Sequence, residues 1–145
     1  MSYQEKNILV SLISTILVFG YYLMELISLG QQDTLNSTAV VDLMVTIIIA
    51  MILVNIVTHV VFNIINKMTT EEQEPGFADE LDKLIELKAT RNSHYAFMIG
   101  FMLTILASLV IEISLLVLFI LVFLYLISSC IIGEISKLYL YRKGI

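Results

Sequence analysis

Four long apolar runs occupy most of this chain, and they limit the folds that it can adopt. They cover about residues 8–29, 39–65, 95–112 and 115–135. A helix needs about 20 mostly apolar residues to cross roughly 30 Å of hydrocarbon, and all four runs are close to that length or exceed it. We therefore predict an all-α integral membrane protein, a four-helix bundle of two antiparallel hairpins, in which residues 1–145 form a single membrane domain.

The composition agrees with lipid as the main solvent. Hydrophobic residues make up 59% of the chain and charged residues 14%, against about 45–50% and about 25% in soluble proteins. The net charge of −5 argues against a basic surface that binds nucleic acid directly. The single cysteine excludes an internal disulfide and a zinc cluster. We expect neither a metal nor another cofactor.

The distribution of cations predicts the orientation, because Lys and Arg in short flanking segments stay in the cytoplasm. All eight lie on one side of the predicted layout: before the first run, in the polar loop 66–94, and after the fourth run. The opposite side, residues 30–38 and the tight turn around Glu112, has none. We expect a multi-pass protein of the cell membrane, with both termini and the loop 66–94 in the cytoplasm.

The loop 66–94 contains a predicted amphipathic helix over about residues 77–91. Its apolar residues have helical spacing, and an acid precedes a lysine at i,i+4, the order that supports a helix. The helix either lies on the inner membrane surface or continues into the third span. Its charges are either a solvated start of that span or a docking surface for a cytoplasmic protein. The candidate partner-binding residues are Asp79, Asp82, Lys83, Glu86, Lys88 and Arg91.

Two segments have distinctive motifs. The run DELDKLIELKATRNSHY at 79–95 directly precedes a predicted span, and the chain closes with Lys137-Leu138 and Tyr141-Arg142-Lys143-Gly144. Both resemble signatures of an uncharacterised family of small four-helix bacterial membrane proteins, a domain of unknown function. Genes of this family often lie beside those of helix-turn-helix regulators. The resemblance implies a bacterial inner-membrane location, a regulatory context and such a regulator as a candidate partner.

Carboxylates gather at the predicted outer edge of the membrane. Glu25 and Asp42 each lie about one turn from the outer end of a run, and Asp33 and Glu112 lie at the same edge, with no cation among them. Ionisable groups within spans are costly and are candidate functional residues. These four either bind a cation or a proton, or they are interfacial groups that reach water.

A polar stripe follows the inner half of the second run. Its members lie three or four residues apart: Asn55, Thr58, His59, Asn63 and Asn66. Such a stripe either forms hydrogen bonds across a helix interface or lines a polar pathway. The candidate cation or proton site comprises Glu25, Asp42, Glu112, His59, Asn55 and Asn63.

Small residues form seams in the last two runs. The third run has them at strict i,i+4 spacing, and the fourth has two more at the same spacing: Ala96, Gly100, Thr104 and Ser108, then Ser129 and Gly133. Seams of this kind let helices approach closely. They either pack the two runs on each other or join protomers. At the inner end of the fourth run, Glu134 and Lys137 are predicted to form a local ion pair.

No nucleophile with a base, Gly-rich phosphate loop or metal-ligand spacing is present, so we expect no enzymatic activity. The leading hypothesis is a small regulatory or sensory membrane protein that engages a cytoplasmic partner through residues 66–94 and its C-terminal tail. The alternative is a small oligomeric cation or proton channel, or a proton-coupled transporter, that uses the outer carboxylates and the His59 stripe. Four spans enclose little volume, so we expect a homo-oligomer.

Overall fold

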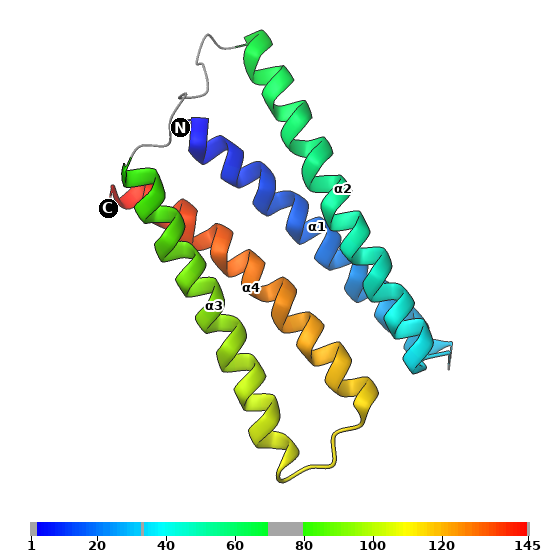
Figure 1. Cartoon of the computed structure of the whole chain (residues 1–145). Coiled ribbons are helices and arrows are strands. Elements are labelled where there is room, and N and C mark those ends of the chain that lie inside the picture. Colours follow the sequence, from blue (N-terminus) through cyan, green and yellow to red (C-terminus); the bar gives the residue numbers. More distant parts are fainter. Residues whose placement is uncertain (1–2, 33, 70–79, 145) are drawn as a thin grey trace.

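The computed structural model describes residues 3–32, 34–69 and 80–144. They form four helices: α1 (Tyr3–Gln31), α2 (Ser37–Thr69), α3 (Glu80–Ser108) and α4 (Leu115–Lys143). These residues contain no strand, which confirms the all-α prediction. Consecutive helices run in opposite directions, and α1 lies beside α2 as α3 lies beside α4 (Figure 1). The first turn of α1 and the last turn of α4 share one end of the molecule, here termed the terminal end.

Three of the four helices are long and apolar enough to cross a membrane: Gln4–Gln31, Ser37–Ile65 and Leu115–Lys143. The exception is α3, which begins with charged turns and ends at Ser108 rather than at 112. Its apolar part, residues 95–108, covers about 21 Å at 1.5 Å per residue. That is short of the roughly 30 Å of a hydrocarbon core. The helix that contains the predicted span 95–112 thus ends at Ser108, where the chain turns.

Polar caps mark where two of the helices begin. The Asn36 side chain accepts a hydrogen bond of 2.8 Å from the amide three residues ahead, at the start of α2. Ser114 does the same at 3.3 Å at the start of α4. These oxygens satisfy amides that the first turn of a helix leaves free. At its other end α4 continues beyond the apolar run, which ends near 135, to Lys143, and Gly144 closes it in the left-handed conformation with φ 69°.

The predicted amphipathic helix and the third apolar run belong to one helix. Because α3 is unbroken from Glu80 to Ser108, the predicted amphipathic helix continues into the third apolar run and is not a separate helix. Residues 77–79 of the prediction lie outside the described residues. The charged residues at the start of α3 and the third apolar run therefore belong to one continuous helix.

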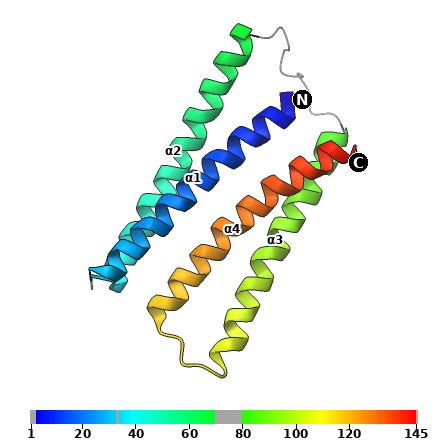
Figure 2. The same cartoon turned by 180° about the vertical axis from the view of Figure 1, so that it is seen from behind.

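The helix α4 is central and packs on each of the other three. In both views it lies between α3 on one side and α1 on the other (Figures 1 and 2). Along its length α3 packs only on α4 within the described ranges. The buried core lies among α1, α2 and α4, where the Tyr22 and Phe123 rings meet edge to face with centroids 5.1 Å apart.

Candidate functional site

Asp82 joins three helices at the terminal end. Its carboxylate accepts a hydrogen bond of 2.7 Å from the Tyr141 hydroxyl and one of 2.9 Å from Nε2 of Gln4. These contacts tie the first turns of α1 and α3 to the end of α4. Asp82 was expected to face a partner, but the structure places it, half-buried, in an internal junction.

Three leucines near the start of α3 point away from the molecule. Ile85 and Ala89 are buried, 1% and 0% exposed, on the side of α3 that packs on α4. Leu81, Leu84 and Leu87 are 41%, 43% and 69% exposed. A soluble surface tolerates single exposed leucines, but three within seven residues form a patch. This patch has no cover among the described residues.

The exposed charges around the leucines have both signs: Glu80 and Glu86 are acidic, and Lys83 is basic. Lys83 and Arg91 are exposed and Lys88 is half-buried, and none of them forms an ion pair with another described residue. Arg142 and Lys143 are exposed at the end of α4. Among the remaining expected partner-binding residues, Glu86 is exposed and Asp79 lies outside the described ranges. We term the exposed leucines and the exposed cations of this end of the molecule the terminal platform: Leu81, Lys83, Leu84, Leu87, Arg142 and Lys143.

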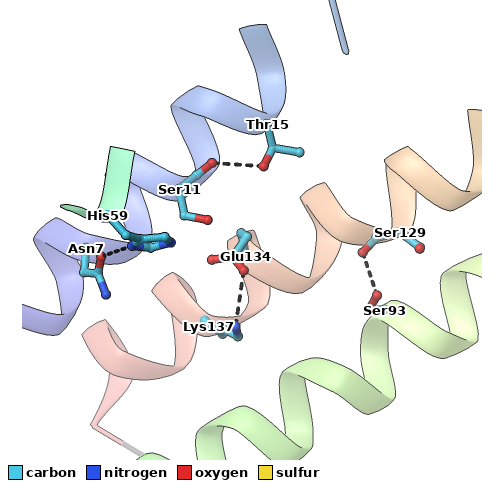
Figure 3. A network of polar contacts seen from close by, with 8 residues as sticks. All are labelled: Asn7, Ser11, Thr15, His59, Ser93, Ser129, Glu134 and Lys137. Carbon is cyan, nitrogen blue, oxygen red and sulfur yellow. Dashed lines mark hydrogen bonds and ion pairs between the residues drawn. The ribbon is translucent and has the colours of Figure 1, made fainter. Parts of the chain in front are cut away.

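The small-residue seams bring α3 and α4 together. A Cβ added to Gly100 would lie 2.5 Å from the Tyr125 ring, and one added to Gly133 would lie 3.3 Å from the Cβ of Ser93. The Ser93 hydroxyl donates a hydrogen bond of 2.7 Å to the Ser129 carbonyl (Figure 3). Packing of the two helices within one chain is therefore one use of the seams.

The other seam residues differ in burial. Thr104 is buried, and its Oγ1 lies 3.3 Å from the Tyr125 hydroxyl. Ala96 is half-buried, whereas Ser108 is exposed at the end of α3. The seam is therefore tight in its middle and opens toward the connection to α4.

The polar stripe of α2 contacts α1. Nδ1 of His59 lies 2.8 Å from Oδ1 of Asn7 (Figure 3), and the hydroxyls of Thr58 and Ser14 lie 3.2 Å apart. Asn55 instead donates back to a carbonyl of its own helix. The stripe thus forms a polar helix interface. Of its remaining members, Asn63 is half-buried and has a partner, and the Asn66 side chain is outside the described part.

The helix α1 turns its polar residues toward the interior. Helical spacing places seven of them on one side: Gln4, Asn7, Ser11, Ser14, Thr15, Tyr22 and Glu25. Ser14 and Thr15 are buried, and Tyr22 is 0% exposed. The Tyr22 hydroxyl is buried with no hydrogen-bond partner among the described residues. On the facing side of α4, Glu134 forms the expected ion pair with Lys137, at 3.2 Å (Figure 3).

The expected outer carboxylates are spread over the molecule. Glu25 is half-buried on α1, Asp42 is exposed on α2, and Glu112 is exposed in the connection between α3 and α4. Both views place that connection apart from the ends of α1 and α2 (Figures 1 and 2). The described residues include no group of three or more His, Cys, Asp or Glu that could hold a metal ion. Asp33 lies outside the described residues.

Sequence patterns do not reveal the Asp82 junction or the Asn7 contact of His59. Asp82 and Tyr141 are 59 residues apart, and no spacing rule joins residues at that separation. The only sequence signal is that each belongs to one of the two motifs noted above. Comparison of the chain with protein-family models, with curated proteins and with solved structures found no match.

Proposed function

We propose that this is a small non-enzymatic membrane protein, regulatory or sensory, that docks a cytoplasmic protein on the terminal platform. The observation that carries the proposal is the exposure of Leu81, Leu84 and Leu87 on the charged part of α3. Full burial of one leucine is worth about 1.5–3 kcal/mol. Three leucines left in water beside cations favour a protein that covers them.

The proposal places all four helices in the membrane, with the terminal end in the cytoplasm. The position of every Lys and Arg supports this orientation. Single cysteines can be introduced into a Cys130→Ser background at Gln4, Gln32, Lys83 and Glu112 and labelled with a membrane-impermeant maleimide. We expect the second and fourth to react in intact cells, and the first and third only after permeabilisation. The reverse pattern would overturn the orientation.

The charges of the terminal platform define the chemistry of the partner. The cations Lys83, Arg142 and Lys143 lie at the same end of the molecule as the leucines, so we propose that the matching surface combines apolar and acidic side chains. The resemblance of residues 79–95 to a family encoded beside helix-turn-helix regulators supports a regulator of that class. We therefore propose an acidic, amphipathic segment of such a regulator as the docked element.

Site-specific photo-crosslinking in cells tests this docking. A photoreactive residue at Leu84 is compared with one at Ile99, which is also exposed but lies in the apolar part of α3. We expect a protein adduct at 84 alone, whose crosslinked peptide contains acidic and apolar residues, and we expect Lys83→Glu to weaken it. Equal adducts at both positions, no effect of Lys83→Glu, or crosslinks solely to a second copy of this chain would contradict the proposal.

The inward polar side of α1 favours a second candidate function, a homo-oligomeric cation or proton channel or a proton-coupled transporter. In lipid, polar side chains face the protein interior, where a buried polar row such as Ser14, Thr15 and Tyr22 can line a pathway for ions. The purified protein in liposomes can be assayed for ion and proton flux beside Glu25→Gln, Asp42→Asn and His59→Ala. Reduced flux in these variants would support this candidate, and absence of wild-type flux at every pH would reject it.

A further inference from the structure

One line of side chains on α3 changes from cationic to aromatic to aliphatic along the helix. Its members are three or four residues apart, and so share one side: Lys88, Arg91, Tyr95, Ile99 and Met102. Lys88 is half-buried and the others are exposed. At 1.5 Å per residue the line is about 21 Å long. Half of a bilayer with its headgroups measures roughly 20–22 Å, so the line has the length and polarity order of one phospholipid.

Contacts with α4 set the depth of the two cations. Asn92 donates a hydrogen bond of 3.4 Å to Ser136, and Ser93 donates one of 2.7 Å to the Ser129 carbonyl. Arg91 therefore lies level with a part of α4 that still exposes isoleucines to its surroundings. At this level Arg91 is at the edge of the hydrocarbon, where an unneutralised guanidinium is costly.

The acidic residues near this line do not neutralise Lys88 and Arg91. Neither Lys88 nor Arg91 forms an ion pair with another described residue. Helical spacing places the nearest α3 acids, Asp82 and Glu86, on the other side of the helix, and Asp82 accepts hydrogen bonds from α1 and α4. On α4, the carboxylate at this level is Glu134, which is paired with its own helix neighbour at 3.2 Å. An incoming anion therefore meets two unpaired cations.

We propose that this line, termed the lipid stripe, binds one anionic phospholipid of the inner leaflet. The phosphate lies between Lys88 and Arg91, Tyr95 is level with the glycerol, and an acyl chain runs along Ile99 and Met102. Arg suits the phosphate because its planar guanidinium donates two parallel hydrogen bonds. The lipid also compensates for the short apolar part of α3, since its phosphate neutralises an arginine close to the hydrocarbon. This inference rests on the membrane insertion and orientation proposed above.

Native mass spectrometry of the full chain in mild detergent tests the lipid stripe, with phosphatidylglycerol and phosphatidylcholine as probes. We expect wild-type protein to retain phosphatidylglycerol preferentially. Because one cation near an anionic lipid is worth about 1 kcal/mol, removal of both in Lys88→Gln/Arg91→Gln should lower retention about 30-fold. The matched Arg142→Gln/Lys143→Gln variant removes the same charge from the end of α4 and should retain the lipid. Arg91→Lys, which keeps the charge, should retain most of it.

Three results would overturn the lipid stripe: equal retention by wild type and Lys88→Gln/Arg91→Gln, equal loss in both double variants, or displacement of the lipid by millimolar inorganic phosphate, which would identify a free anion as the ligand. Circular dichroism checks that the variants keep their helix content. If the double variant unfolds, the single variants Lys88→Gln and Arg91→Gln are each compared with wild type for lipid retention. Cysteine labelling reports membrane orientation without lipid binding, so failure of either proposal can be recognised separately.

Discussion

The two helix pairs of this protein are held together by partly different means. In the α3–α4 pair, Gly100 lies so close to the Tyr125 ring that a single added carbon would overlap it. In the α1–α2 pair, polar side chains meet across the gap, as Asn7 and His59 do at 2.8 Å. Both pairs have hydrogen bonds across the interface, since Ser93 donates to the Ser129 carbonyl in the α3–α4 pair, but that pair also has the close approach at Gly100.

Lipid around the helices, which the apolar runs predict, explains why such contacts matter. Lipid chains are as apolar as leucine, so burial of apolar surface contributes little to helix association in a membrane. Close backbone packing and hydrogen bonds across the interface remain. Both pairs have such hydrogen bonds, and the α3–α4 pair also has the close packing at Gly100. The α3–α4 pair should therefore be sensitive to volume, and the α1–α2 pair to the loss of donors and acceptors.

The largest expected effect is that of Gly100→Ala. The added carbon would lie within 2.8 Å of three atoms of the Tyr125 ring, so we expect unfolding to become easier by about 1–3 kcal/mol. SDS titration in mixed micelles measures this free energy. Gly20→Ala is the matched control, because a carbon there meets nothing within 4 Å. If Gly100→Ala is as stable as wild type, close packing does not hold this pair.

Asp82→Ala should come next, because it removes the acceptor that joins α3 to both α1 and α4. Hydrogen bonds to a charged group contribute about 1.5–3 kcal/mol each when buried, and partial exposure reduces this to about 1–2 kcal/mol in total. The free energy of unfolding and hydrogen exchange of the first α3 turns measure the loss. Glu86→Ala removes an equal charge from an exposed site. Equal effects of the two variants would show that the junction contributes nothing.

A double-mutant cycle between Asn7→Ala and His59→Ala should give a smaller effect, the coupling free energy between the two side chains. Interhelical hydrogen bonds in membrane proteins average about 0.6 kcal/mol of coupling, and we expect a value of that order, from free energies of unfolding in mixed micelles. The cycle between Asn7→Ala and Asn55→Ala is the control, since Asn55 bonds within α2. A coupling of zero for the first cycle would mean that the polar pair does not stabilise α1 against α2.

Tyr22→Phe should have the smallest effect and the opposite sign. The variant keeps the ring contact with Phe123 and removes a hydroxyl that has no partner among the described residues. We expect the free energy of unfolding to be unchanged or raised by less than about 1 kcal/mol. Tyr22→Ala, which removes the ring as well, is the control that should lower the free energy of unfolding. A clear loss in Tyr22→Phe would show that the hydroxyl binds water or a ligand in the protein.

The lengths of the apolar runs predicted the number of helices and their approximate positions, because each run is about as long as one membrane-spanning helix. The ends of the helices differ from the ends of the apolar runs. The polar residues before 8 and after 135 are helical, since hydrogen bonds at the Asp82 junction and the Gly144 cap extend the helices past the apolar part. Conversely, residues 109–111 are apolar but not helical. Hydrophobicity does not distinguish an apolar turn from the end of a span.

Residue spacing predicted shared sides of helices but not what those sides contact. The spacing of Gly100 and Gly133 identified surfaces for close approach, and the partners Tyr125 and Ser93 appear only in the structure. For α3, periodicity grouped its apolar residues into one amphipathic helix. Packing then buried Ile85 and left Leu84 exposed. Which part of an apolar side is covered depends on where the neighbouring helix lies, and a single sequence does not record that.

The central position of α4 has a consequence for the order of assembly. Translation proceeds from the N-terminus, so α4 is the last of the four helices to leave the ribosome. The α1–α2 pair can form before that, because its polar contacts lie between helices already made. α3 must wait, since along its length it packs only on α4 within the described ranges. A nascent chain halted before α4 therefore holds one finished hairpin and a third helix whose described contact with it is the hydrogen bond of Gln4 to Asp82.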